Sequence, residues 1–386
     1  MNSESTPVSY SLKDLIIYFL KLGTWGFGGP VALVGYMHRD LVENKKWISE
    51  EDYKEGMALA QLAPGPLAAQ LSIYLGYVHY RILGATLVGL AFVFPSFLMV
   101  LAIGYAYVAF GGLPWMQAIF YGVGASVIGI IVVSSYKLTK KSLGTDWWLW
   151  GIFLVLSITT FWTEEENMWL ILGSGVLIWF IKARPDFSRN SLKTICMPLI
   201  FQLPQVSASG KLWQLAWFFT KAGAFVFGSG LAIVPFLYGG VVKEYQWLNE
   251  QQFIDAVAVA MITPGPVVIT VGFIGYLTAG FWGACVAAAA TFLPCYVFTI
   301  LPAPYFKKYG KHPAIKAFVD GVTAAAIGAI AGAVLVLGKR TLIDIPTVVL
   351  ALTTALILLR FKKLQEPFVI LGAAVIGIIL KLYLLN

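Results

Sequence analysis

Long apolar runs separated by short charged clusters dominate the chain. The runs are about 17 to 25 residues long, which is enough for a helix to cross a bilayer. In the first half they cover about 14–36, 57–79, 83–108, 114–136, 147–163 and 167–182; in the second half they cover about 213–238, 256–278, 282–301, 314–338, 344–360 and 366–384. This pattern predicts an all-α polytopic membrane protein.

One apolar run in each half contains the same interruption. Pro64-Gly65-Pro66 and Pro264-Gly265-Pro266 lie 200 residues apart. Each proline removes a backbone donor, and each second proline disfavours helical geometry at the glycine before it. Inside a membrane such a break persists only where protein buries it or where it lines a cavity. Paired breaks in two halves therefore indicate the substrate site of a transporter.

The interruption belongs to a repeat that covers most of the chain. At an offset of 200, Lys21 pairs with Lys221 and Phe27-Gly28 with Phe227-Gly228; after one deletion the offset is 199. A match this long and this nearly free of gaps is a true internal repeat. The predicted divisions are an N-terminal transporter repeat over 1–183, a linker over 184–211 and a C-terminal repeat over 212–386.

Corresponding loops of the two halves differ in charge. Glu164-Glu165-Glu166 corresponds to a segment that contains Arg360, Lys362 and Lys363. Because basic loops favour the cytoplasmic face, matching loops of opposite charge are expected on opposite faces. We therefore predict two inverted-topology repeats, each with about five transmembrane helices plus a re-entrant hairpin broken at Pro-Gly-Pro. That gives ten spans with both termini outside; if the broken runs cross the membrane, the count is twelve.

Composition narrows the class of protein further. Hydrophobic residues make up 59% of the chain and charged residues 12%, and the formal net charge is +8. Basic cytoplasmic loops account for this charge without a nucleic-acid partner. Three cysteines and three histidines are scattered, so we expect no metal site, no disulfide framework and no cofactor. The sequence also lacks a nucleophile–base constellation, so we expect no catalytic residues.

The repeated positions suggest how an anion is held. Lys21 and Lys221 lie about two turns into the first apolar run of each half, where an unpaired charge is costly. They are predicted to bind an anion; the alternative is that each ammonium reaches the nearer interface along its own side chain. Helices beginning at Pro66 and Pro266 would offer free N–H groups and a positive dipole end to the same anion, unless the motif is a plain kink.

Further anion-binding candidates lie beside the lysines and the proline motifs. They are Gly28, Gly29, Gln70, Gly228, Ser229, Thr263 and Thr270, together with the residues of both proline motifs, Pro64, Gly65, Pro66, Pro264, Gly265 and Pro266. The glycines have the alternative of a packing role, because small residues let membrane helices approach closely. Glu55 and Asp255 form a matched acidic pair just before the broken runs and are predicted to couple protons to transport. Their alternative is a solvated face of the connector.

The motifs resemble those of a known family. They are Phe27-Gly28-Gly29-Pro30, Gln61-Leu62-Ala63-Pro64-Gly65-Pro66, Lys221-x-Gly223, Phe227-Gly228-Ser229-Gly230 and Thr263-Pro264-Gly265-Pro266. Together they are similar to the chromate ion transporter family in its long, two-domain form. The resemblance implies a multi-pass carrier in the plasma membrane of a prokaryote that exports chromate using the proton-motive force. The implied partners are chromate or a sulfate-like oxyanion and the lipid bilayer, and a homodimer is left open.

Three alternatives stand beside chromate export. One is a carrier for sulfate or another oxyanion, since sulfate shares the size, shape and charge of chromate. A second is an oxyanion channel, which would neither saturate nor depend on a proton gradient. A third is a membrane-embedded enzyme, which would need a cluster of His, Asp or Glu at membrane depth. The sequence offers no such cluster.

Overall fold

The structure, a computed structural model, confirms the class of fold. It describes residues 10–27, 29–110, 114–163, 168–183, 210–225, 233–306, 312–361, 364 and 366–381, and within these ranges the regular elements are all helical. Among the described residues, four helices are long and apolar enough to cross a membrane: Leu67–Phe110, Trp115–Lys140, Val267–Tyr305 and Pro313–Lys339. The chain is an all-α membrane protein. Gly28, Gly228, Ser229 and residues 184–209 of the predicted linker lie outside the described residues.

The helices of the two halves correspond in order. The first half contains α1 (Leu12–Trp25), α2 (Gly29–Met37), a short π-helix η1 (His38–Asn44), α3 (Glu50–Leu62), α4 (Leu67–Phe110), α5 (Pro114–Leu143), α6 (Trp147–Thr163) and α7 (Met168–Lys182). The second contains α8 (Lys211–Phe225), α9 (Ile233–Leu237), η3 (Tyr238–Glu244), α10 (Glu250–Ile262), η4 (Val267–Ile269), α11 (Thr270–Ile300), η5 (Ala303–Tyr305), α13 (Pro313–Thr341), α14 (Ile345–Arg360) and α15 (Glu366–Ile379). The helices before both proline motifs start at side-chain caps, from Ser49 and Asn249.

The first apolar run of each half is not the single helix that the sequence predicted over 14–36 and 213–238. Helix α1 ends at an extended Gly26, and the Tyr18 hydroxyl donates to the carbonyl of Tyr36, so the chain doubles back. In the second half the ring of Phe218 stacks on that of Phe236, with centroids 5.1 Å apart. A straight helix would separate these two phenylalanines by about 27 Å. Each half therefore opens with a helical hairpin.

The chain reverses again at each Pro-Gly-Pro. Gly56 of α3 lies against the ring of Tyr74 in α4, and the Thr270 hydroxyl donates to the carbonyl of Ala256, across the second motif. Helix α4 then turns sharply at Arg81, where φ is +52°, so that Gly76 contacts Gly84. Helix α11 turns in the same way at Ala279 and Gly280. The sequence predicted the breaks, and the structure places a short helix on either side of each one.

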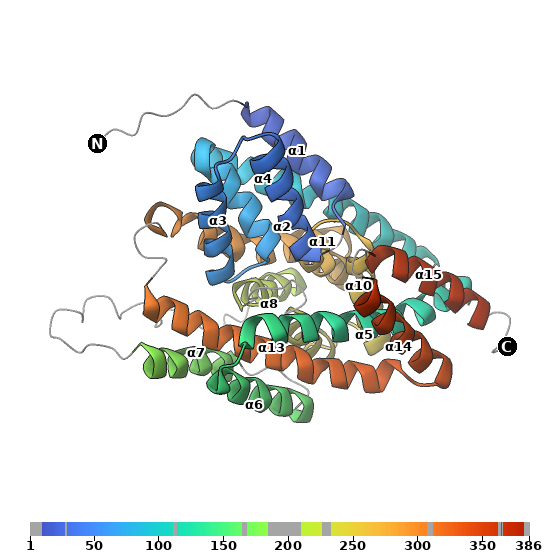
Figure 1. Cartoon of the computed structure of the whole chain (residues 1–386). Coiled ribbons are helices and arrows are strands. Elements are labelled where there is room, and N and C mark those ends of the chain that lie inside the picture. Colours follow the sequence, from blue (N-terminus) through green and yellow to red (C-terminus); the bar gives the residue numbers. More distant parts are fainter. Residues whose placement is uncertain are drawn as a thin grey trace, which may run out of the picture.

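The two halves are interlocked (Figure 1). Helices α6 and α7 of the first half pack against α13 of the second, whereas α14 and α15 of the second pack against α5 of the first. Glycines permit the close approach: a Cβ on Gly122 would lie 2.7 Å from the Cα of Gly377, and one on Gly321 would lie 2.9 Å from the Cα of Gly175. The repeats visible in the sequence therefore exchange their last two helices in space.

Corresponding long helices run in opposite directions. A Cβ on Gly124 of α5 would lie 3.6 Å from Thr341 of α13, and one on Gly338 of α13 would lie 3.7 Å from Ile128 of α5. Since the residue numbers rise along α5 as they fall along α13, the two helices are antiparallel. The second part of α4 (82–110) also contacts that of α11 (281–300), where Thr86 hydrogen-bonds to Tyr296.

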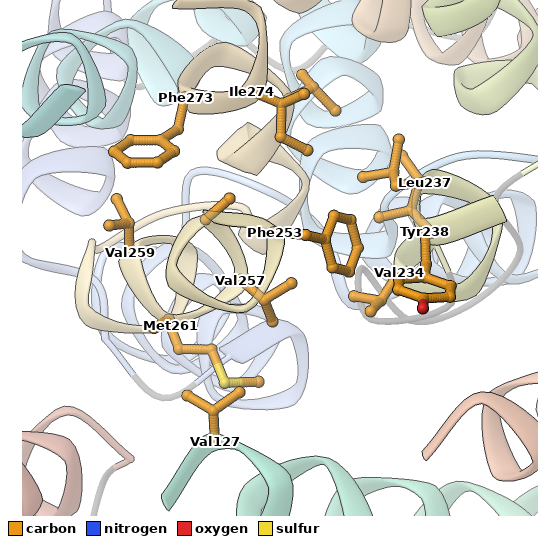
Figure 2. Close-up of a cluster of buried hydrophobic side chains, with 14 of the residues drawn as sticks. Val127, Val234, Leu237, Tyr238, Phe253, Val257, Val259, Met261, Phe273 and Ile274 are labelled. Carbon is orange, nitrogen blue, oxygen red and sulfur yellow. The ribbon is translucent and has the colours of Figure 1, made fainter. Parts of the chain in front are cut away.

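Helix α10 forms part of the core. All of its residues from Phe253 to Met261 are buried. Figure 2 shows Met261 pointing toward Val127 of α5, and Phe253 facing Val234 and Tyr238. Its counterpart α3 buries fewer positions. The two proline hairpins are thus equivalent in sequence but not in burial.

Candidate functional site

The Pro-Gly-Pro turn of the first half is held by a buried glutamine. Gly65 has φ of +143°, a backbone angle that residues other than glycine rarely adopt. Gln70 is fully buried, and its Nε2 donates to the carbonyl of Pro64 at 2.8 Å. The Oε1 of the same amide is buried and has no partner among the described residues. Gln70 thus braces the turn and leaves one acceptor unsatisfied.

A helix begins directly after Pro66. The first helical hydrogen bond of α4 runs from the amide of Gln70 to the carbonyl of Pro66 at 3.0 Å. The amides of Leu67, Ala68 and Ala69 therefore have no acceptor within the helix, and all three residues are buried. Unpaired amides and the positive helix end form a ready anion site. Helix α3 ends at the same turn, and its terminal carbonyls carry partial negative charge. An anion is therefore favoured on the side of the turn where α4 begins.

The turn of the second half is built differently. Gly265 has φ of +89°, and a short 3-10 turn, η4, separates Pro266 from α11. The Thr263 hydroxyl donates to the carbonyls of Val259 and Ala260, and the Thr270 hydroxyl donates to Ala256. Both hydroxyl protons are engaged by backbone in this conformation, so donation to an anion would require each side chain to rotate.

The two turns meet the opposite halves of the protein. The amide of Gly265 donates to the carbonyl of Gly26 at 3.0 Å, which joins the second proline turn to the first hairpin. A Cβ on Gly265 would lie 2.9 Å from Ser96 Oγ, and one on Gly65 would lie 3.1 Å from Cys295 Sγ. Ser96 and Cys295 were not among the predicted site residues. The repeat would have identified them, since they pair at the offset of 199, directly after matched prolines.

The predicted lysines lie at the margin of the helices that carry them. Lys21 is exposed, on the opposite side of α1 from the buried Leu15, Phe19 and Leu22. Lys221 is half-buried, with its Nζ 5.7 Å from the ring centre of Trp217 on the same helix. The Lys21 ammonium therefore lies on the exposed side of α1, and that of Lys221 lies beside Trp217.

The predicted acidic pair is unequal. Asp255 is 3% exposed and accepts hydrogen bonds from the Tyr107 hydroxyl at 2.7 Å and from Gln251 Nε2 at 2.8 Å. Glu55 is half-buried on α3 and interacts with the Tyr74 hydroxyl. The alternative of a solvated connector face does not fit Asp255, because its carboxylate is buried in the core. Gly29, the remaining candidate, begins α2.

The brace at Gln70 gives a testable expectation for stability. Gln70→Leu removes the donor to the half-buried Pro64 carbonyl and should cost about 0.5–1.5 kcal/mol of unfolding free energy. Gln61→Leu is the matched control, since Gln61 is exposed on α3. Thermal unfolding of the purified protein in detergent measures both changes. Equal melting temperatures for the two variants would contradict the bracing role.

Comparison with known proteins identifies the family. The model described as chromate transporter matches residues 13–179 and 213–378. A chromate transport protein of Cupriavidus metallidurans is 69% identical, covering 98% of this chain and 95% of its own length. A probable chromate transport protein of Synechococcus elongatus is 63% identical, covering 96% of each. A chromate transport protein of Pseudomonas aeruginosa is 28% identical, covering 97% of this chain and 94% of its own length. No solved structure matches. The chain belongs to the chromate transporter family.

Proposed function

We propose that this protein is a secondary carrier that exports chromate across the plasma membrane of a prokaryote, driven by the proton-motive force. Membership of a family of transporters supports transport rather than enzymatic catalysis. The observation that carries the proposal is the hydrogen bond from Gly265 to Gly26. It joins the proline turn of the second half to the hairpin of the first, so the halves meet at a break of the kind that lines a transporter's substrate site.

The proposed anion site lies at the two proline turns. The buried amides of Leu67, Ala68 and Ala69 are its strongest donors, and Gln70 fixes the turn that presents them. Lys21 and Lys221 are proposed to raise the local anion concentration from the margin of the site. Gly28, Gly228 and Ser229 remain sequence-based candidates, and proton coupling is proposed for one member of the acidic pair, Glu55 or Asp255.

We further propose that the halves are inverted in the membrane, with the hairpins entering from opposite faces. The antiparallel course of α5 and α13 supports the inversion, as does the opposite charge of corresponding loops. Arms of 14 and 13 residues, in α1 and α3, are about 20 Å long and fall short of a 30 Å hydrocarbon core. We therefore propose that both hairpins of each half are re-entrant and that the long helices are spans, which replaces the span that the sequence pattern assigned to 14–36 and to 213–238.

Sulfate or another oxyanion is the alternative substrate, because backbone amides do not distinguish tetrahedral dianions of similar size. A channel for the same ions is the alternative mechanism. The partners we propose are thus chromate or a sulfate-like oxyanion and the bilayer, with a homodimer left open.

Chromate uptake into inside-out vesicles energised by respiration tests the proposal. We expect saturable uptake that stops when the proton gradient is collapsed and that excess sulfate inhibits, because backbone amides do not distinguish the two dianions. Uptake without saturation, independent of the gradient, would favour a channel. No uptake of chromate, with labelled sulfate transported instead, would contradict the substrate.

The lysines give a graded prediction in the same assay. Lys21→Ala and Lys221→Ala should each raise KM for chromate roughly two- to fivefold with little change in maximum rate, because a solvent-screened charge contributes about 0.5–1 kcal/mol. Lys13→Ala, at the exposed start of α1, is the matched control. Complete loss of uptake in either variant would instead place that lysine directly on the anion, and unchanged kinetics would leave it as an interfacial residue.

A further inference from the structure

We propose that Asp255, rather than its repeat partner Glu55, is the residue whose protonation couples the proton gradient to movement between the two halves. The inference rests on the proposed function and assigns its coupling step to one carboxylate. The sequence presents the two acids as equivalent, since they occupy the same place in the repeat. Their surroundings in the structure distinguish them in three ways.

The first difference is access to water. Asp255 lies within the fully buried stretch of α10, from which Phe253, Val257, Val259 and Met261 join the apolar cluster of Figure 2. Removing a carboxylate from water costs several kcal/mol unless a cation or hydrogen bonds compensate. Glu55 keeps part of its surface exposed. A change in local hydration therefore alters the charge state of Asp255 far more than that of Glu55.

The second difference is the hydrogen-bond partner. Tyr107, whose hydroxyl donates to Asp255, belongs to α4 of the first half, so this bond links the halves directly. The Tyr74 partner of Glu55 belongs to the same half as Glu55. The repeat position of Tyr74 is Phe273, which has no hydroxyl, and its ring packs on that of Tyr107 with centroids 5.3 Å apart. In the first half the acidic residue Glu55 therefore contacts a tyrosine of its own half, whereas in the second half Asp255 contacts a tyrosine of the other half.

The third difference is the electrostatic setting. The elements packed against α10 include α4, α5, α11, α15, η3 and η4. Among the described residues of these elements, Tyr107 is the titratable group that faces Asp255, and the other donor, Gln251, is neutral. No described Lys, Arg or His forms an ion pair with this carboxylate. Neutralising it therefore requires a proton rather than a neighbouring cation.

These features define a two-state element. When the halves are closed and water is excluded, Asp255 is neutral; when they separate and water enters, it is ionised. The proton comes from bulk water and returns to it, and the hydrogen-bonded Gln251, exposed at the start of α10, marks the entry side. No other bond is made or broken in this step.

The same turn of α10 is tied to the anion site. Ala256, next to Asp255, accepts the hydrogen bond from Thr270 that holds the helix after Pro264-Gly265-Pro266. Gly265 of that turn in turn donates to Gly26 of the other half. A shift of α10 when Asp255 changes charge is therefore transmitted to the proline turn through two hydrogen bonds.

The test uses the full chain reconstituted in proteoliposomes and measures two modes of transport. One is accumulation of radiolabelled chromate driven by a pH gradient, and the other is exchange of labelled for unlabelled chromate at equal pH. For Asp255→Asn we expect accumulation to fall by roughly tenfold or more, as for a lost coupling between two sites. Exchange should continue and lose its dependence on pH. Glu55→Gln should accumulate chromate, as should Asp146→Asn, a carboxylate paired with Lys182 outside the core.

Several outcomes would overturn the inference. Gradient-driven accumulation retained by Asp255→Asn would do so, as would its loss in Glu55→Gln alone. If Asp255→Asn does not yield folded protein, Tyr107→Phe removes just the hydroxyl; a pH profile of exchange identical to native would then contradict the link between halves. Native protein that moves chromate in neither mode would overturn the proposed function itself. Native protein that exchanges but never accumulates chromate would reject proton coupling alone.

Discussion

Replacing Gly65 with alanine should lower chromate transport by an order of magnitude or more while leaving the protein in the membrane. The backbone at Gly65 has φ of +143°, where a side chain costs about 1–3 kcal/mol. An added Cβ would also lie 2.7 Å from Gln70 Nε2 and 3.1 Å from Cys295 Sγ. The turn must therefore shift, and with it the amides that start α4. Vesicle uptake normalised to protein amount measures the effect.

A second substitution separates the two causes of this loss. Gln70→Ala removes the amide that the new Cβ would meet, together with its hydrogen bond to Pro64, so the double variant is compared with Gln70→Ala alone. We expect equal uptake by these two variants if crowding dominates, and lower uptake by the double variant if the backbone angle φ dominates. Gly173→Ala is the matched control, because a Cβ there meets no atom within 4 Å. Native uptake by Gly65→Ala would remove this turn from the transport site.

Replacing Gly321 with valine should prevent the halves from packing. A Cβ at this position would collide with the carbonyl of Ser174 and lie 2.9 Å from the Cα of Gly175, so α13 and α7 would have to separate. Overpacking of this kind costs about 1–3 kcal/mol, and more where backbone rather than a side chain is in the way. We expect a lower melting temperature and a severalfold lower yield of monodisperse protein on size exclusion.

The packing of α15 of the second half against α5 of the first predicts a corresponding effect at Gly122 of α5. Gly122→Val should have a similar effect, because its Cβ would lie 2.7 Å from the Cα of Gly377 in α15. Gly372→Val, on the same helix α15, should be tolerated, because no atom lies within 4 Å of its Cβ. If Gly122→Val and Gly321→Val were as stable as this control, the exchange of helices between halves would be wrong.

The apolar pattern alone determined the class of protein, because an uncharged run of about 17 to 25 residues is stable as a helix in lipid. The repeat determined that two equivalent halves exist, and two prolines determined that each half has a break. Family membership was likewise readable from the motifs around Gly28 and Gly65. The class, the repeat, the breaks and the family depend on residues that are close together in the sequence, or on the same residue type recurring at a fixed spacing of about 200 positions.

The Phe27-Gly28-Gly29-Pro30 motif is visible in the sequence, but the pattern predicts one helix through it, with its glycines as candidates for anion binding or for packing. Glycine and proline weaken a helix by amounts that a tertiary contact can outweigh in either direction. Here the contacts between Tyr18 and Tyr36 and between the rings of Phe218 and Phe236 settle the outcome in favour of a reversal. Local sequence cannot supply that information, because the partners lie 18 residues apart in each half.

The pairing of the halves was decided by tertiary structure alone. Because the repeats carry similar faces, α6 and α7 could pack on α5 as readily, by pattern, as they do on α13. For the same reason the sequence did not predict that Asp255 is buried, because its partner Tyr107 lies 148 positions away in the other half. The sequence determined which helices form and where they break; the tertiary structure decided which half each one faces, because burial and hydrogen bonding depend on neighbours that the local pattern does not specify.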